Sequence, residues 1–222
     1  MKILFFIILF VLTIISNANL YDDIIFPKTY IKKIFQKTNA SYLVFVKKRL
    51  FKLFIIDKKL KICEIFSVAI GKEKNFKRKI YQDDNATPEG LYYITEILSE
   101  NSPTNTISYK KLKKMNSIYL KAKDGHYKWN NPNLDLGTNS YGPRFFRINY
   151  PNQDDKKLYR ELISKRIIKD SINIGYGIGI HGTNDPDSIG HLITSGCIRM
   201  KNEEIVKLDK YIKIGTPVLI EK

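Results

Sequence analysis

The stretch from residue 175 to residue 200 restricts the fold more than any other part of the chain. It reads GYGIGIHGTNDPDSIGHLITSGCIRM, and glycine alternates with larger side chains over its first seven residues. Because side chains alternate between the two faces of a β-strand, one face of a strand here would consist of Gly175, Gly177, Gly179 and His181. A face without side chains lets a substrate backbone lie close to the sheet and to one imidazole. The alternative is that the glycines only relieve crowding in a curved sheet.

The opposite face of this strand would carry three residues that point into a core, namely Tyr176, Ile178 and Ile180. The same run contains the spacing G-x-G-x-x-G, formed by Gly177, Gly179 and Gly182. In dinucleotide-binding proteins a helix begins at that loop, and its N-terminus holds the pyrophosphate. Here Asn-Asp-Pro follows at residues 184–186 and no βαβ pattern surrounds it, so the sequence argues against a nucleotide site.

Cys197 lies sixteen positions after His181 and is preceded by Gly196. A cysteine attacks as its thiolate, which a nearby histidine or cation favours by lowering the thiol pKa. Gly196 leaves the approach to the sulfur open and frees backbone N–H groups to stabilise an oxyanion. Arg199 falls on the same strand face as Cys197, and its guanidinium suits a carboxylate. Each residue alone is a weak signal, but the spacing of the set is specific.

The rest of the chain predicts a mostly β domain. Apolar and β-branched runs divided by charged turns predict strands at residues 41–46, 50–57, 61–70, 91–97 and 218–220. Residues 87–90 (Thr-Pro-Glu-Gly) have proline and glycine where a type I turn prefers them. Residues 155–169 show helical periodicity, and a second helix is expected to begin at Asn202, a good N-cap.

Lysine and arginine total 38 against 22 acidic residues, which gives a formal net charge of +16. A charge of that size favours anionic partners, such as an anionic cell wall or membrane surface. The lysines are scattered and no nucleic-acid-binding motif accompanies them, so nucleic acid is not expected as a partner. The alternative is a basic surface without a specific partner. Two cysteines exclude a disulfide-rich scaffold and a four-cysteine zinc site.

The first eighteen residues predict a secretory signal peptide. Lys2 supplies a positive charge, residues 3–15 are apolar apart from one threonine, and residues 16–18 (Ser-Asn-Ala) offer small side chains for cleavage. The apolar run is shorter than the about 20 residues that span a bilayer. We therefore expect export to the periplasm or cell envelope, a linker or short packing segment at residues 19–40, and a domain from residue 41 to residue 222. An uncleaved anchor and a buried N-terminal strand are the alternatives.

Two segments together resemble the signature of the L,D-transpeptidase (YkuD-like) catalytic domain family. They are residues 181–184 (His-Gly-Thr-Asn) and residues 195–200 (Ser-Gly-Cys-Ile-Arg-Met). The turn at residues 87–90 matches the T-P-x-G turn of that family. The likeness extends from residue 41 to residue 222, and residues 99–169 are the least alike, which suggests a variable insert or lid. The resemblance implies a mostly β, sandwich-like domain with a few short helices.

This resemblance implies a peptidoglycan L,D-transpeptidase, a cysteine-dependent acyltransferase that uses no metal or other cofactor. Such an enzyme cleaves a tetrapeptide stem of peptidoglycan after its third residue and passes the acyl group to an acceptor amine, in cell-wall cross-linking or remodelling. Peptidoglycan stem peptides are then its partners. One alternative is a hydrolase on the same fold, either an L,D-carboxypeptidase or an amidase that releases a wall-attached protein. Another is a non-catalytic wall-binding module. The sequence predicts no oligomeric state.

The resemblance and the chemistry of the residues together suggest individual roles. Cys197 would attack the carbonyl carbon, and His181 would take the thiol proton and return it to the leaving amine. The Gly182 carbonyl would orient the imidazole, and the N–H groups of Gly196 and Cys197 would form an oxyanion hole. The residues expected to bind substrate are Arg199, Thr183, Ser195, Arg144 and Tyr141.

Ser195 departs from the family pattern, which usually has a histidine at this position. The departure bears on the rate or on the choice of acceptor rather than on the base, which is His181. Four aromatic residues of the variable segment are candidates for a lid, with plain packing as the alternative: Tyr127, Trp129, Tyr141 and Phe145.

The remaining histidine and cysteine residues carry weaker expectations. His126 is expected to be exposed in its loop, and Cys63 is expected to be a buried thiol on a core strand. A disulfide between Cys63 and Cys197 is a minor alternative. A zinc site made of His181, His191 and Cys197 is another, but its spacing fits no standard pattern.

Overall fold

The computed structural model describes residues 27–222, and its fold is mostly β, with 30% of residues in strands and 26% in helices. The predicted signal peptide at residues 1–18 and the first part of the predicted linker lie outside the described residues. Within the described part, no helix combines the length and the apolar character needed to cross a membrane.

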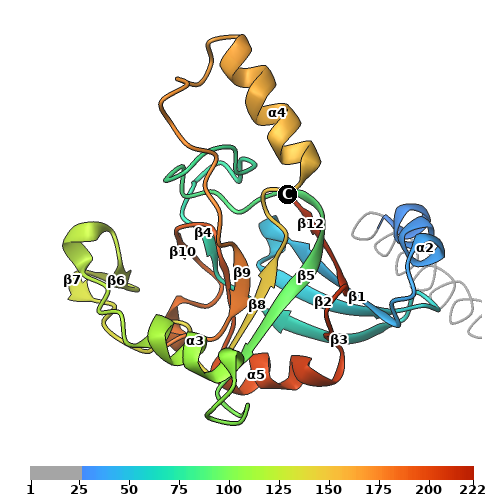
Figure 1. Cartoon of the computed structure of the whole chain (residues 1–222), viewed down its shortest axis with the longest axis horizontal. Helices are drawn as coiled ribbons and strands as arrows, with labels where there is room; N and C mark the ends of the chain where they lie inside the picture. The colour runs from blue at the N-terminus through green and yellow to red at the C-terminus, as the bar shows by residue number, and fades with distance from the viewer. Residues whose placement is uncertain (1–26) are drawn as a thin grey trace, which may run out of the picture.

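The centre of the molecule is a curled sheet of eight strands in the order β11-β9-β8-β5-β12-β1-β2-β3 (Figure 1). These strands are β1 (Tyr42–Lys47), β2 (Lys52–Asp57), β3 (Ile62–Ser67), β5 (Gly90–Ser99), β8 (Arg144–Ile148), β9 (Gly179–His181), β11 (Ile198–Arg199) and β12 (Pro217–Glu221). β1 pairs in parallel with β12 and antiparallel with β2. Two small sheets complete the β structure, one of β10 (Leu192–Thr194) with β4 (Ile70–Gly71) and one of β6 (Tyr127–Lys128) with β7 (Asn131–Asp135).

β1 and β2 are buried on both faces, which explains their unbroken apolar sequences. On one face, Leu43 and Phe45 lie in a cluster with the buried side chains of α2 (Lys28–Lys37). On the other face, Val44 and Val46 belong to the main core, to which α5 (Asn202–Lys207) contributes. Part of the segment expected to be a linker or packing segment is therefore a helix that covers the sheet.

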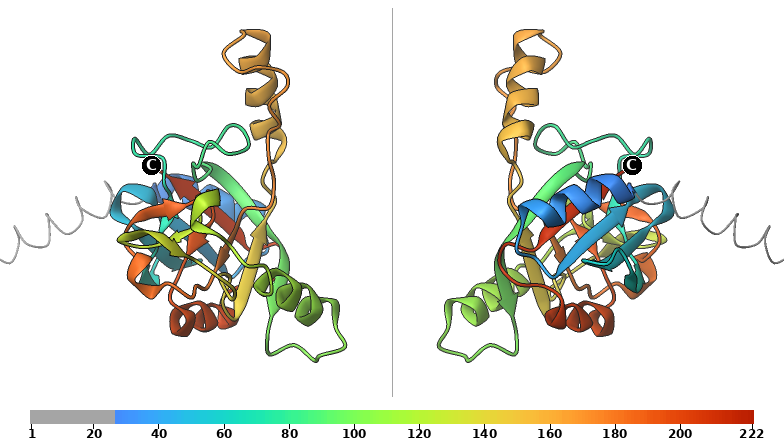
Figure 2. Two further views of the ribbon diagram at one scale, coloured as in Figure 1. Left: turned by 90° about the vertical axis from the view of Figure 1, so that its left-hand side faces the viewer. Right: turned by 90° about the vertical axis from the view of Figure 1, so that its right-hand side faces the viewer.

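Most predicted strands are present, with ends shifted by a few residues. The predicted strand at residues 50–57 begins only at residue 52, because Lys48–Leu50 form a short 3-10 turn, η1. The predicted strand at residues 61–70 is divided into β3 and β4. The predicted helix at residues 155–169 is α4 (Gln153–Ser164), which projects away from the body of the molecule (Figures 1 and 2).

The glycine-rich strand is much shorter than predicted. Only residues 179–181 join the sheet, as β9, because Gly175 and Gly177 adopt φ values of +81° and +85°, which interrupt an extended strand. The prediction that Tyr176 points into a core is wrong, since its side chain is 84% exposed. Ile178 and Ile180 are buried as expected.

Residues 99–169 are not simply a variable insert. Within them, β8 lies between β5 and β9 in the main sheet, and its Phe146 and Ile148 belong to the main core. Three other parts of the segment lie outside the main sheet: α3 (Ile107–Asn116), the β6–β7 hairpin and α4.

A buried ammonium group fixes the course of the long loop between β4 and β5. Lys48 is only 1% exposed, and its Nζ donates hydrogen bonds to the carbonyls of Phe76, Lys77 and Thr87 at 3.0–3.2 Å. The same atom lies 2.6 Å from a carboxylate oxygen of Glu89. The desolvation of burial lowers the pKa of Lys48, and Glu89 opposes this effect.

We expect Lys48→Met to lower the free energy of unfolding by about 2–4 kcal/mol, because it removes the shared partner of three carbonyls and one carboxylate. The neighbouring cation Arg49 is exposed, and Arg49→Met should change stability by less than about 0.5 kcal/mol. Urea denaturation followed by circular dichroism measures both. Equal stabilities of the two variants would contradict the role given to Lys48.

Candidate active site

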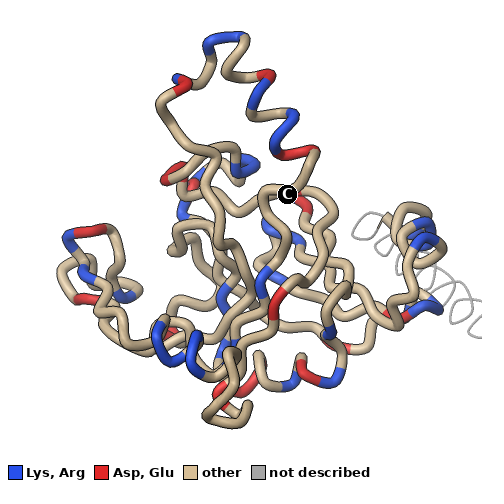
Figure 3. The backbone as a smooth tube through the Cα atoms, in the orientation of Figure 1, with Lys and Arg blue, Asp and Glu red and all other residues tan. Residues whose placement is uncertain are grey.

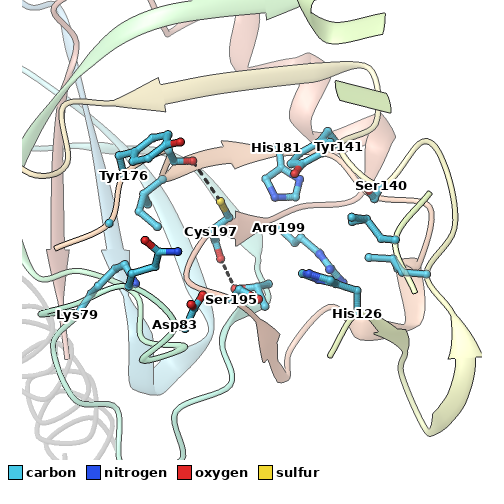
Figure 4. A pocket seen from close by; sticks show the side chains of 17 residues that line it. Lys79, Asp83, His126, Ser140, Tyr141, Tyr176, His181, Ser195, Cys197 and Arg199 are labelled. Atoms are coloured by element: carbon cyan, nitrogen blue, oxygen red, sulfur yellow. Dashed lines mark hydrogen bonds between the residues drawn. The ribbon is translucent and has the colours of Figure 1, made fainter. Parts of the chain in front are cut away.

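The predicted nucleophile and the predicted base line one cavity of about 330 Å³ (Figure 4). Four segments provide its lining: residues 79–83, residues 120–141, residues 175–181 and residues 194–199. The last two meet because β9 and β11 pair in parallel at the edge of the main sheet, with Arg199 opposite His181. Cys197 immediately precedes β11, so strand pairing brings together two motifs that are separate in the sequence.

The backbone just before Cys197 is held by Thr87. The Thr87 hydroxyl donates to the carbonyl of Gly196 at 3.0 Å and accepts from the N–H of Gly71 at 2.8 Å. Gly196 has φ +131°, and a Cβ there would come within 2.7 Å of the Ala86 carbonyl oxygen. The turn at residues 87–90 is thus connected directly to the segment that carries the nucleophile.

The Cys197 side chain is a neutral thiol in this environment. Burial raises its pKa. The Gly179 N–H and nearby cations, chiefly Arg199, lower the pKa but do not overcome the effect of burial. The thiol donates to the Gly177 carbonyl, with sulfur and oxygen 3.8 Å apart (Figure 4). To transfer its proton to His181, the side chain must therefore leave this carbonyl.

His181 is oriented as a neutral base. Its Nδ1 lies 2.6 Å from the Gly182 carbonyl oxygen, which can only accept, so Nδ1 carries the proton and Nε2 has the lone pair. The ring stacks on Phe145 with centroids 5.6 Å apart and lies beside Tyr141 at 5.0 Å. The side chain is 4% exposed, and burial, together with the charge of Arg199, lowers the pKa of His181 to about 3.

The two expected oxyanion donors differ in availability. The N–H of Gly196 donates to the Thr194 hydroxyl at 3.1 Å, so it is not free to donate to an oxyanion as the sequence suggested. Thr194 in turn donates to the Cys197 carbonyl at 2.6 Å, so it fixes the turn that carries the nucleophile. Of the two, the Cys197 N–H is left as the candidate donor to an oxyanion.

Arg199 gives one end of the cavity a positive charge. The residue is 6% exposed, its Nη1 is 4.0 Å from Asp185 and 3.5 Å from the Ser188 hydroxyl, and its Nε has no partner among the described residues. A buried guanidinium with such distant partners retains capacity for a carboxylate.

His126 lines the same end of the cavity, although the sequence suggested an exposed loop residue (Figure 4). Its pKa is lowered by burial and by Lys72 and Arg199, so this imidazole is neutral as well. Lys72 donates to the carbonyl of the preceding residue, Gly125, at 3.1 Å, which helps to hold the loop in place. No sequence motif marked His126, because its position depends on the fold of residues 120–141.

Arg144 and Thr183 do not line the cavity, contrary to the expectation that they bind substrate. Arg144 is buried, and its Nε and Nη2 donate to the carboxylate of Asp209 at 2.8–3.0 Å. The Thr183 hydroxyl accepts from the Asp185 N–H at 3.0 Å, and its own N–H donates to the Asn202 side chain at 2.8 Å. Both residues therefore support the backbone around the site.

Ser195 and Tyr141 do line the cavity, and Ser195 is exposed there. The four aromatic residues considered for a lid have different positions. Phe145 is a core residue under His181, while Trp129 stacks on His191 with centroids 3.8 Å apart. The backbone N–H of Trp129 also donates to the carboxylate of Asp185 at 2.9 Å, so the β6–β7 hairpin is attached to the loop after β9.

Both cysteines are free thiols, so the alternative of a disulfide is wrong. Cys63 lies half-buried on β3 rather than fully in the core. In residues 27–222, no three side chains of histidine, cysteine, aspartate or glutamate are grouped in a way that could hold a metal ion. His191, one of the three ligands considered for zinc, is stacked on Trp129.

Three relatives show what the chain is similar to. It is 29% identical over 178 residues to the protein named "Putative L,D-transpeptidase YqjB" of Bacillus subtilis (strain 168), a match that covers 80% of this chain and 69% of the relative. It is 48% identical over 44 residues to "Putative L,D-transpeptidase YkuD" of the same strain, covering 20% of this chain and 27% of that protein. The crystal structure of the helical cell shape determining protein Pgp2 (K307A mutant) from Campylobacter jejuni has a similar fold, with a TM-score of 0.51 at 19% identity over 83% of this chain.

The similarity to Pgp2 spans 48% of that protein's chain, so this chain corresponds to about half of it. The model of the YkuD family, described as the L,D-transpeptidase catalytic domain, matches residues 41–220. That match covers the main sheet except the last residue of β12, and all four segments that line the cavity. The chain therefore belongs to the YkuD family of L,D-transpeptidase catalytic domains.

Proposed function

We propose that the protein is a peptidoglycan L,D-transpeptidase that uses Cys197 as its nucleophile. The observation that supports this proposal is that Cys197 and a neutral His181, whose Nδ1 is bound to the Gly182 carbonyl, line one cavity. The donor is a tetrapeptide stem of peptidoglycan, cleaved after its third residue. D-Alanine leaves, and the acyl group passes to an acceptor amine of another stem peptide or of a protein.

The proposed reaction has two steps through a thioester. In the first step, His181 Nε2 takes the thiol proton, the sulfur bonds to the carbonyl carbon of the third residue, and the proton passes to the departing D-alanine amine. In the second step, the acceptor amine loses a proton to His181, forms the new amide bond and displaces the sulfur, which regains the proton. The N–H of Cys197 faces the negative oxygen that forms in each step.

Arg199 is proposed to hold a carboxylate of the substrate. Three observations support this role of Arg199: its Nε has no partner among the described residues, its Nη1 is 4.0 Å from Asp185, and the residue lines the cavity. A charge-assisted pair in a partly dry cavity is stronger than one at the surface. His126 and Tyr141 line the same end and would contact the same part of the substrate.

We also propose that the protein is exported and acts in the periplasm or cell envelope, as the signal-like residues 1–18 and its family suggest. The form recovered from the envelope should begin at Asn19, and N-terminal sequencing tests this. A full-length form confined to the cytoplasm would contradict it.

Incubation with a disaccharide tetrapeptide, followed by mass analysis of the products, tests the proposed activity. Cross-linked dimers are expected from the wild type. Trimmed tripeptide alone would indicate a carboxypeptidase, and unchanged substrate would indicate a non-catalytic module.

Cys197→Ala should lower turnover by a factor on the order of a thousand or more, because no other thiol lines the cavity. Cys63→Ala is the matched control, since Cys63 is the other free thiol and lies on β3, and it should keep full activity. Circular dichroism should show that both variants keep the native fold. Activity retained by a folded Cys197→Ala protein would contradict the cysteine mechanism.

The low pKa of His181 predicts an unusual pH profile. A base with a pKa of about 3 remains neutral when the pH falls through the ordinary histidine range near 6.5, so activity should persist there. Acylation by a carbapenem-type β-lactam probe should therefore change less than about threefold between about pH 7 and about pH 5. His126→Gln should show the same flat profile. A loss of activity with a midpoint near 6.5 in the folded wild type would contradict the assignment.

A further inference from the structure

The two ends of the cavity differ in charge. One end has Arg199 and His126, as described above, and the other is formed by residues 79–83 and residues 175–178 (Figure 4). Asp83 lies at this second end, and it is the only acidic residue in the lining of the cavity. In Figure 4 its carboxylate lies between Lys79 and Ser195, on the side of Cys197 away from His126.

The Asp83 carboxylate has no hydrogen bond or ion pair among the described residues; only its backbone carbonyl accepts, from Asn85 at 3.0 Å. The carboxylate of the neighbouring Asp84, by contrast, has hydrogen-bond donors on both of its oxygen atoms. It accepts from Lys79 Nζ at 2.8 Å and from three backbone N–H groups, those of Ile80, Tyr81 and Ala86. Because Lys79 is paired with Asp84, it does not neutralise Asp83.

Several contacts keep Asp83 at the cavity. The carboxylate of Asp84 holds the loop together by accepting hydrogen bonds from backbone N–H groups on both sides of it. Asp83 itself has φ +64°, which aspartate tolerates better than most residues. The adjacent Gln82 N–H donates to the Asn173 carbonyl at 2.7 Å, and Gly175 is so close that a Cβ there would lie 3.2 Å from Gln82 Cα. These contacts fix the position of Asp83 in the wall of the cavity.

The charge of this residue opposes that of the chain as a whole. The net charge is +16, and Lys and Arg are spread over helices α2, α3 and α4 as well as the loops (Figure 3). An exposed carboxylate without a partner among the described residues, in the wall of the cavity that contains Cys197, is complementary to a cationic ligand. The ring of Tyr176 lines the same end and is largely exposed, so it can add a cation–π contact.

We propose that Asp83, with Tyr176, forms a subsite for an alkylammonium group of the stem peptide. The inference rests on the proposed function, in which the substrates are peptides and the acceptor is an amine. The ammonium belongs either to the side chain of the donor's third residue or to the acceptor, whose attacking amine would give up its extra proton to solvent before it reaches the thioester. In this role Asp83 binds the ammonium and takes no proton from the reacting atoms, so it is a positioning residue and not the base.

Direct binding tests the subsite without turnover. In a Cys197→Ala background, which cannot form the thioester, Asp83→Asn should weaken binding of a tetrapeptide with a free side-chain amine about threefold to tenfold. Asp83→Asn should not change the binding of the peptide whose side-chain amine is acetylated. Added salt should weaken binding of the free-amine peptide more in the protein that has Asp83 than in Asp83→Asn. Asp170→Asn, at an exposed acid outside the cavity, is the matched control.

Two further measurements on the active enzyme distinguish the sources of the ammonium. If the donor provides it, Asp83→Asn raises the KM for the donor only. If the acceptor provides it, binding of the donor peptide is unchanged, and the KM for the acceptor amine rises about threefold to tenfold at constant kcat. Unchanged donor binding together with an unchanged acceptor KM overturns the inference.

A different measurement, acylation by a β-lactam probe, tests the proposed function itself. A β-lactam probe without an amino group should acylate the wild type and Asp83→Asn equally fast. A folded wild type that is not acylated at Cys197 contradicts the proposed function. The subsite at Asp83 is still tested in that case, by comparing binding of the peptides with a free and with an acetylated side-chain amine.

Discussion

The buried ammonium of Lys48 is the constraint on which the active-site side of the molecule depends. A buried charge is tolerated only when several oxygen atoms replace its water, and here three carbonyls and Glu89 do so. These acceptors lie in the irregular loop between β4 and β5, which has no strand pairing to hold most of its length. Lys48, the first residue after β1, therefore attaches this loop to the sheet and sets the position of Thr87.

From Thr87 the constraint continues to the nucleophile. The Thr87 hydroxyl joins Gly71 to Gly196, and Cys197 follows at once. The base is supported from another direction, because His181 ends β9 and stacks on Phe145 of β8. The proposed nucleophile and the proposed base are thus supported by two different parts of the fold, the loop held by Lys48 and the main sheet, and they meet where β9 pairs with β11. A change in either support would alter their relative position.

How much the sequence could predict depended on how local each interaction is. Cys197, His181 and the Gly182 carbonyl were found because they lie in two short motifs, and the His181–Gly182 hydrogen bond joins neighbouring residues. The strands β1 and β2 were found because burial on both faces leaves long apolar runs. Arg144 was misassigned because its partner Asp209 lies 65 residues away, and no local pattern indicates that pairing.

Other errors also have tertiary causes. The alternation at residues 175–181 fits a strand, but positive φ values at Gly175 and Gly177 interrupt it and leave Tyr176 exposed. The N–H of Gly196 is used by Thr194, which only the folded turn reveals. Asp83 and His126 carry no motif, and they reach the cavity because two long loops fold toward it. The family resemblance predicted the nucleophile and the base, and the residues of the surrounding cavity wall had to come from the structure.

The electrostatics of the cavity indicate when the proton moves. Burial raises the pKa of Cys197 and lowers that of His181, so it opposes a thiolate–imidazolium pair through both partners. Arg199 lowers both pKa values, so its effects on transfer of the proton from sulfur to nitrogen oppose each other. The resting state is the neutral pair, and in the proposed mechanism thiol deprotonation accompanies formation of the carbon–sulfur bond, when negative charge passes to the oxyanion beside the Cys197 N–H. Burial of the pair would then make the proposed reaction depend on a bound acyl donor, whose carboxylate Arg199 is proposed to bind.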